Sequence, residues 1–265
     1  MYFYHYARDF YAYSKAQQLR VEAAITFIAI VFAFIGIHML RRSFGQPLST
    51  EYGWKLPQEK YVRRYEVGAR LYHWSNLVVL AGLVTTGTLL FLPTSFWEVP
   101  WLIIHEIFAG LFVVGLAFHI IIAPRRGCVR AMWFEKRDWL DLKLIFANFF
   151  GRTRQYPAFG KYDPFQKLYH LSITMLSFAV IFSGIFLVLS AQVWLTFSHE
   201  WMRIMRLMHD IAAFVFVAII IGHIYFGLMR VNWPYLVAMI TGRLKGSFYN
   251  RYHDTSRWEP KDERN

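Results

Sequence analysis

Residues 207–228 read LMHDIAAFVFVAIIIGHIYFGL, an apolar run that contains one acidic side chain and two histidines, His209 and His223. A helix of roughly 20 residues crosses the about 30 Å of hydrocarbon in a bilayer. This stretch therefore predicts a membrane-spanning helix. Four other stretches have the same character, and we predict five spans, near residues 22–40, 70–92, 101–123, 166–190 and 205–229.

The composition excludes most other classes of protein. Hydrophobic residues make up 56% of the chain and charged residues 17%, whereas a soluble domain has about 45–50% and about 25%. Aromatic residues reach 19%, which is typical of proteins with Tyr and Trp belts at both membrane surfaces. An ordinary soluble enzyme and a disordered chain are both excluded.

The net charge of +12 is concentrated between alternate spans. Lys and Arg number three in residues 1–21, six in 41–69, none in 93–100, nine in 124–164, one in 191–204 and seven in 230–265. Because cytoplasmic loops are enriched in these residues, the chain is expected to have its N-terminus outside and its C-terminus inside. The basic residues form no continuous face, so no nucleic-acid partner is expected.

Two segments outside the last four spans have distinct roles. The span at 22–40 is followed by Arg41 and Arg42 and by no small-residue cleavage pattern, so we expect it to remain as an anchor. The loop after the third span is predicted to contain an amphipathic helix around 136–150 that lies along the membrane surface. No internal repeat is evident.

The histidines fall into two layers. His209 and His223 are 14 residues apart, so they share a helix face about 21 Å apart along the axis. The third span repeats this spacing, and two further spans begin with a histidine on the cytoplasmic side. The outer layer is His105 and His209, and the inner layer is His73, His119, His170 and His223. His38 and His199 lack depth-matched partners and are expected to contact solvent.

Paired histidines at one depth favour haem. Haem iron takes two axial imidazoles from facing helices, whereas zinc needs further ligands, and only Glu106 and Asp210 are acids beside these positions. The single cysteine, Cys128, excludes a Cys-ligated iron–sulfur cluster and covalent haem attachment through Cys-x-x-Cys-His. We predict two haems about 20 Å apart, with several pairings open for the inner one.

At these positions the sequence resembles the cytochrome b (gamma) subunits of membrane-bound formate dehydrogenases, within the wider family of formate dehydrogenase and nickel–iron hydrogenase di-haem cytochromes b. The resemblance covers about residues 61–250, so 1–60 with the extra span lie outside it and 251–265 form a cytoplasmic tail. The matching segments are RLYHW (70–74), IIHEIFAG (103–110), KYDPFQK (161–167), LMHDIAAF (207–214) and GHIYF (222–226).

The resemblance implies a four-helix transmembrane bundle that holds two haems b. By motif, His105 and His209 would bind the outer haem and His73 and His223 the inner one. His119 and His170 are alternative inner ligands or proton carriers.

The resemblance also implies a quinone site, for menaquinone or ubiquinone, near the inner haem. KYDPFQK is similar to the KYNxxQK-like stretch of the family, with Asp163 and Phe165 as departures and Gln166 kept. Asp163, Gln166 and Lys161 are therefore the expected quinone-site residues.

Haem propionates need cationic partners. Arg203 and Arg206 precede His209 and could pair with the outer haem, and Arg64 and Arg70 precede His73 and could serve the inner one. The alternative for these arginines is snorkelling to the membrane surface.

The expected function follows from these sites. The protein is predicted to be an electron-transfer subunit in a bacterial or archaeal cytoplasmic membrane. It would connect the quinone pool to a periplasm-facing iron–sulfur or cytochrome subunit and a catalytic subunit. A haem-free anchor for such a complex is the alternative, and it leaves the matched histidine depths unexplained. A histidine-relay transporter is disfavoured because few carboxylates lie within the spans.

Overall fold

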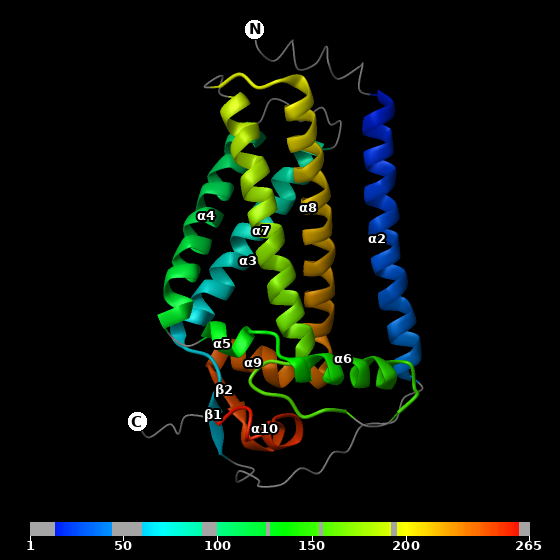
Figure 1. Cartoon of the computed structure of the whole chain (residues 1–265), viewed down its shortest axis with the longest axis vertical. Coiled ribbons are helices and arrows are strands. Elements are labelled where there is room, and N and C mark those ends of the chain that lie inside the picture. Colours follow the sequence, from blue (N-terminus) through cyan, green and yellow to red (C-terminus); the bar gives the residue numbers. More distant parts are fainter. Residues whose placement is uncertain are drawn as a thin grey trace.

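The computed structural model describes residues 14–43, 60–91, 100–125, 128–153, 156–191 and 195–259. Five long helices in these ranges each contain a stretch long and apolar enough to cross a membrane. They confirm an all-α, multi-pass membrane protein (Figure 1). They are α2 (Ser14–Ser43), α3 (Val67–Phe91), α4 (Trp101–Arg125), α7 (Pro164–Ala191) and α8 (His199–Leu228).

The last four long helices form two hairpins. Helix α3 packs along α4, α7 packs along α8, and the hairpins meet where α4 contacts α7. Helix α2 packs against α8 at one side (Figure 1). There His38 is half-buried and its Nδ1 lies 2.7 Å from the Tyr225 hydroxyl, a partner that the sequence did not predict. The four-helix bundle with one extra N-terminal helix is as predicted.

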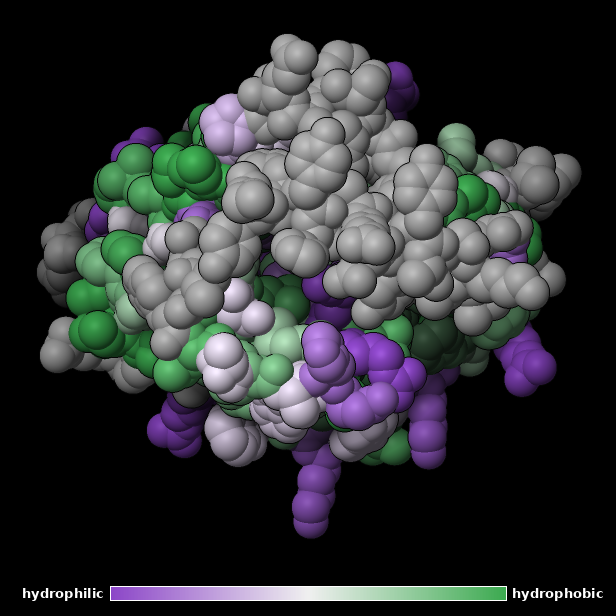
Figure 2. Space-filling view, turned by 90° about the horizontal axis from the view of Figure 1, so that it is seen from above, coloured by the Kyte–Doolittle hydropathy of each residue, from purple (hydrophilic) through white to green (hydrophobic). Residues whose placement is uncertain are grey.

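Polarity is arranged for a lipid environment. Among the residues of the spans, large apolar side chains such as Val114, Met175 and Ile211 are more than half exposed. Seen along the bundle, hydrophobic residues occupy much of the visible rim (Figure 2). The hydroxyl residues Thr86 and Ser183 are buried. These two hydroxyl groups thus face the interior, where the paired histidines also lie.

The last span starts earlier than predicted. Helix α8 begins at His199, and the Ser198 side chain accepts a hydrogen bond from Trp201 N at 3.2 Å as its N-cap. A serine N-cap satisfies a backbone N–H that the helix leaves free. Hydropathy places the start near residue 205 because it does not register this polar first turn.

One end of the bundle carries a cap of short elements (Figure 1). Strands β1 (Tyr61–Arg63) and β2 (Arg243–Lys245) pair antiparallel, with Val62 opposite Leu244. They pack with α9 (Trp233–Thr241) and α10 (Gly246–Tyr252) around a small buried core. The charge pattern assigns this end to the cytoplasm, and we call it the cytoplasmic cap. Its other elements are α5 (Cys128–Met132), α6 (Lys136–Phe149) and η1 (Arg230–Asn232).

Helix α6 is the predicted amphipathic helix. It lies across the direction of the long helices (Figure 1). Its exposed side includes Trp139, Leu140 and Phe146, whereas Asp138 and Asp141 are buried on the opposite side. The apolar exposed side suits the membrane surface.

Candidate haem-binding site

The outer histidine pair is brought together by α4 and α8. The ring centroids of His105 and His209 lie 6.4 Å apart. A metal-bound imidazole nitrogen lies about 2.0–2.1 Å from the metal and about 1.2 Å from its ring centroid, so two rings on opposite sides of one metal have centroids about 6.4 Å apart. The observed separation fits two axial ligands of one iron.

Thr86 lies against the Nδ1 side of His105. The Thr86 hydroxyl donates its single hydrogen to the carbonyl of Gly82 at 2.7 Å, because a carbonyl oxygen can only accept. The same hydroxyl oxygen lies 2.8 Å from His105 Nδ1, and while it donates to Gly82 it is placed to accept a hydrogen from that nitrogen. Protonation at Nδ1 leaves Nε2 with a free lone pair, which is the form that binds a metal.

His209 has the same arrangement. The Ser183 hydroxyl donates to Ala179 O at 2.7 Å and lies 3.1 Å from His209 Nδ1. That Nδ1 is also 3.2 Å from the carbonyl of Val180, so it carries the hydrogen. Both outer imidazoles thus have Nε2 free for iron.

Two glycines lie against the outer rings. A Cβ at Gly87 would lie 3.4 Å from His105 Cε1, and a Cβ at Gly184 would lie 3.5 Å from His209 Cε1, both at ordinary van der Waals distance. The outer rings therefore pack closely against the neighbouring helices α3 and α7.

The inner layer resolves into two pairs. His73 on α3 faces His223 on α8 with ring centroids 6.2 Å apart, and His119 on α4 faces His170 on α7 at 6.1 Å. The pairing of His73 with His223 is the one expected from the resemblance. His73 Nδ1 is buried without a hydrogen-bond partner, so this ring has an unused polar atom in the interior.

The donor set matches haem. In the part of the chain that the structure describes, no group of three or more His, Cys, Asp or Glu side chains is placed to hold a metal ion. Isolated histidine pairs at two depths suit iron that a macrocycle already holds in its plane. The residues present therefore fit b-type haem.

The arginines proposed for propionates occupy varied positions. Arg203 is exposed and pairs with Glu200 at 2.9 Å, and Arg206 is half-buried one turn before His209. Arg70 donates to the carbonyl of Ile240 in α9. Along the chain, Arg206 and Arg70 each lie three residues before a predicted ligand histidine, His209 and His73 respectively.

Arg64 lies in an aromatic cage. Its side chain is buried, and the guanidinium carbon lies 4.4 Å from the Tyr235 ring centroid and within 6 Å of the rings of Tyr65, Tyr162 and Trp258. It also contacts His253 Nε2 at 3.3 Å. Aromatic faces attract a cation, so Arg64 stabilises the cytoplasmic cap.

The expected quinone residues lie at the start of α7. Asp163 N donates to the Gln166 side chain at 3.3 Å, and Gln166 N donates to Asp163 Oδ1 at 2.9 Å. This reciprocal capping box begins the helix. Burial raises the pKa of Asp163, partly offset by the Gln166 N–H and Arg64. Lys161 Nζ lies 5.6 Å from the Tyr162 ring centroid.

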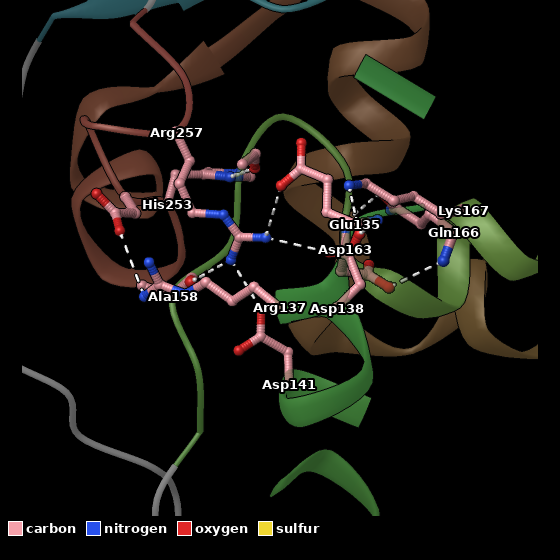
Figure 3. A network of polar contacts seen from close by, with 12 residues as sticks. Glu135, Arg137, Asp138, Asp141, Ala158, Asp163, Gln166, Lys167, His253 and Arg257 are labelled. Carbon is pink, nitrogen blue, oxygen red and sulfur yellow. Dashed lines mark hydrogen bonds and ion pairs between the residues drawn. The ribbon is translucent and has the colours of Figure 1, made fainter. Parts of the chain in front are cut away.

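A buried ionic network fixes this turn to α6 (Figure 3). Asp138 is fully buried and accepts from Lys167 Nζ at 2.8 Å and from Arg257 at 3.1 Å. Arg257 also donates to Asp141 at 2.7 Å. These residues join α6, α7 and the C-terminal segment. Sequence reasoning missed them because charged residues far apart in the chain give no sign that they meet.

The fold and paired histidines define a membrane-embedded haem protein of the cytochrome b class. The chain matches the family model for prokaryotic cytochrome b561 over residues 64–242 and belongs to that family. No curated protein matches it. The protein is thus a membrane b-type cytochrome that binds haem b and transfers electrons, which confirms the cytochrome b prediction at the level of the family. The formate dehydrogenase resemblance and the ligand assignment remain predictions.

Proposed function

We propose that the protein is a haem-bearing membrane subunit that connects a periplasm-facing redox partner to the quinone pool. His105 and His209 would bind an outer haem, and His73 and His223 an inner haem. The observation that carries this proposal is the pair of imidazoles with ring centroids 6.4 Å apart, in which each Nδ1 lies at hydrogen-bond distance from a helix oxygen and Nε2 is left for a metal.

Each bound haem would supply a reversible one-electron change at iron. The chain's residues supply the rest. Thr86 and Ser183 hold the outer rings by accepting from Nδ1, and such contacts increase the basicity of the ligand nitrogen. Tyr169 stacks on His223 with ring centroids 4.6 Å apart, which orients an inner ligand.

The quinone would bind at the cytoplasmic end of α7. Asp163 lies seven residues before His170, about 10 Å along the helix axis. A carboxyl with a raised pKa is suited to giving a proton to a quinone oxygen, and the amide nitrogen of Gln166 remains available as a donor. Lys161 would attract developing negative charge. The two electrons of quinone reduction would be balanced by two protons taken from the cytoplasm.

The partner would dock at the opposite end of the bundle. The outer pair lies near the start of α8, where the exposed first turn carries Glu200 and Arg203. A periplasmic iron–sulfur or cytochrome subunit, with a catalytic subunit of formate dehydrogenase or hydrogenase type, fits this placement. Either direction of electron flow uses the same residues.

A reduced-minus-oxidised spectrum of the purified protein tests the haem assignment. We expect a b-type α band, and its loss in part in His105→Ala or His209→Ala. His199→Ala is the matched control, because His199 is exposed at the same end of the bundle. A protein without a b-type band, or a full band in both ligand variants, contradicts the proposal.

A quinol analogue tests the quinone site separately. In the wild-type protein it should shift the spectrum or potential of one haem, and Gln166→Leu should weaken this response. Arg203→Gln, at the opposite end, should respond as the wild type does. An analogue that affects neither haem contradicts a quinone site near α7.

A further inference from the structure

The two hairpins carry a repeat that becomes clear once their helices are aligned. Residues 70–75 of α3 read RLYHWS, and residues 167–172 of α7 read KLYHLS. In each helix the histidine is followed 13 residues later by a hydroxyl residue and then a glycine: Thr86 and Gly87 in α3, Ser183 and Gly184 in α7. The expectation of no repeat is therefore wrong.

The second helix of each hairpin continues the correspondence. Residues 105–120 of α4 read HEIFAGLFVVGLAFHI, and residues 209–224 of α8 read HDIAAFVFVAIIIGHI. The matches are the two histidines, the acid after the first one, and several apolar positions. The loops between paired helices differ in length, which obscures the repeat along the chain.

Contacts between equivalent residues reveal a pseudo-two-fold axis. His105 contacts its equivalent His209, and Phe112 contacts its equivalent Phe216 with ring centroids 6.2 Å apart. A residue touches its own equivalent only where both lie on a two-fold axis. Since α3 and α7 run in the same direction (Figure 1), this axis follows the long direction of the bundle. The outer pair lies on it.

The inner pairs lie off the axis and are copies of each other. The repeat equates His73 with His170 and His223 with His119, so it maps the His73–His223 pair onto His170–His119. Their ring-centroid distances are 6.2 and 6.1 Å, and their interplanar angles are 56° and 57°.

The neighbouring tyrosines repeat as well. Tyr72 stacks on His119 at 4.5 Å and 11°, and its equivalent Tyr169 stacks on His223 at 4.6 Å and 18°. Both inner pairs therefore have one ring held by a tyrosine and the other presented from the start of a helix.

We infer that His119 and His170 form a third site for an iron porphyrin, at the same depth as the inner haem. This inference rests on the proposed function, which gives His73 and His223 a haem. A site with the same ligands, separation, interplanar angle and stacked tyrosine binds the same group. The protein then holds one haem on its axis and two at the cytoplasmic side.

The haem content of the purified full-length protein tests the inference. Haem is measured as the pyridine complex, and protein by amino-acid analysis. The wild type should contain three haems per chain. His119→Ala and His170→Ala should each contain two, and the double variant should also contain two because both residues bind one iron. His199→Ala should keep three. A redox titration of the wild type should require three one-electron components.

Other outcomes overturn the inference and separate it from the proposed function. Two haems in the wild type, unchanged in both His119 and His170 variants, remove the third site and leave the proposed function intact. Two haems that fall to one in His119→Ala but not in His73→Ala remove the third site and reassign the inner ligands. A purified protein that contains no haem contradicts the proposed function itself.

Discussion

The Thr86→Val variant removes one hydrogen-bond acceptor and little else. Valine has nearly the shape of threonine, so the packing of α3 is kept. His105 Nδ1–H loses the hydroxyl oxygen at 2.8 Å and is left buried without a partner. Such a group costs about 1–3 kcal/mol. At about 1.4 kcal/mol per factor of ten, the outer haem should bind about 5- to 150-fold more weakly.

Ser183→Ala provides the contrast on the other side of the same site. It removes the hydroxyl at 3.1 Å, but His209 Nδ1–H keeps the Val180 carbonyl at 3.2 Å. The remaining partner limits the loss to below about 1 kcal/mol, or about fivefold in haem affinity. The repeat makes the two positions equivalent in sequence, and the additional carbonyl makes them unequal in energy.

Haem transfer to an excess of an apo-haem acceptor measures both variants. The outer haem is identified as the component that is absent in His105→Ala. We expect the order of retention to be wild type, then Ser183→Ala, then Thr86→Val. Retention in Thr86→Val equal to the wild type, or a greater loss in Ser183→Ala, would refute the assignment of hydrogens at this site.

Three further predictions concern packing and the cytoplasmic cap. Asp138→Asn leaves buried Lys167 without its carboxylate at 2.8 Å, and this should lower the stability of the cytoplasmic cap by about 3–5 kcal/mol. We expect faster amide hydrogen exchange in α6, and unchanged exchange would contradict the prediction. Gly82→Ala places a Cβ 2.5 Å from the Phe108 ring, and this overpacking should lower stability by about 1–3 kcal/mol. Adding Phe108→Leu should restore part of the thermal stability measured in detergent, and no recovery would contradict the predicted clash. Burial, with the nearby guanidinium, lowers the pKa of His253 from 6.5 to about 3, so the unfolded segment binds more protons between these values. The contribution of His253 to cap stability should be complete above about pH 6.5 and decrease toward pH 3, and His253→Gln should remove that part of the pH dependence of proteolysis; an unchanged dependence counts against it.

The spans follow from the sequence because hydropathy acts over whole helices. All five were predicted, and the bounds differ where polar turns extend a helix, as at His199 of α8 and Ser14 of α2. The amphipathic α6 was found for the same reason, since its pattern is local. The depth of each histidine in the membrane can also be predicted from one helix at a time, because the fixed rise per residue converts a position in the sequence into a height along the helix axis.

Which helices pack beside one another depends on contacts between distant parts of the chain, and the sequence therefore left several pairings of the inner histidines open. Depth alone could not divide the four inner histidines into pairs, because this depends on which helices face each other. The β1–β2 pairing and the Arg64 cage likewise join residues far apart in the chain. One available signal was overlooked: the segments LYH at 71–73 and 168–170, which identify equivalent helices once they are aligned.

The symmetry of the bundle bears on its ancestry. A half-length chain with only the α3–α4 hairpin could assemble as a homodimer about the same axis. His105 would then meet its own copy, and His73 would meet the copy of His119, so all three imidazole pairs would form from a gene of half the size. After duplication and fusion of that gene, the two halves could diverge, with α6 following the first hairpin and α9 following the second, while all three imidazole pairs were kept.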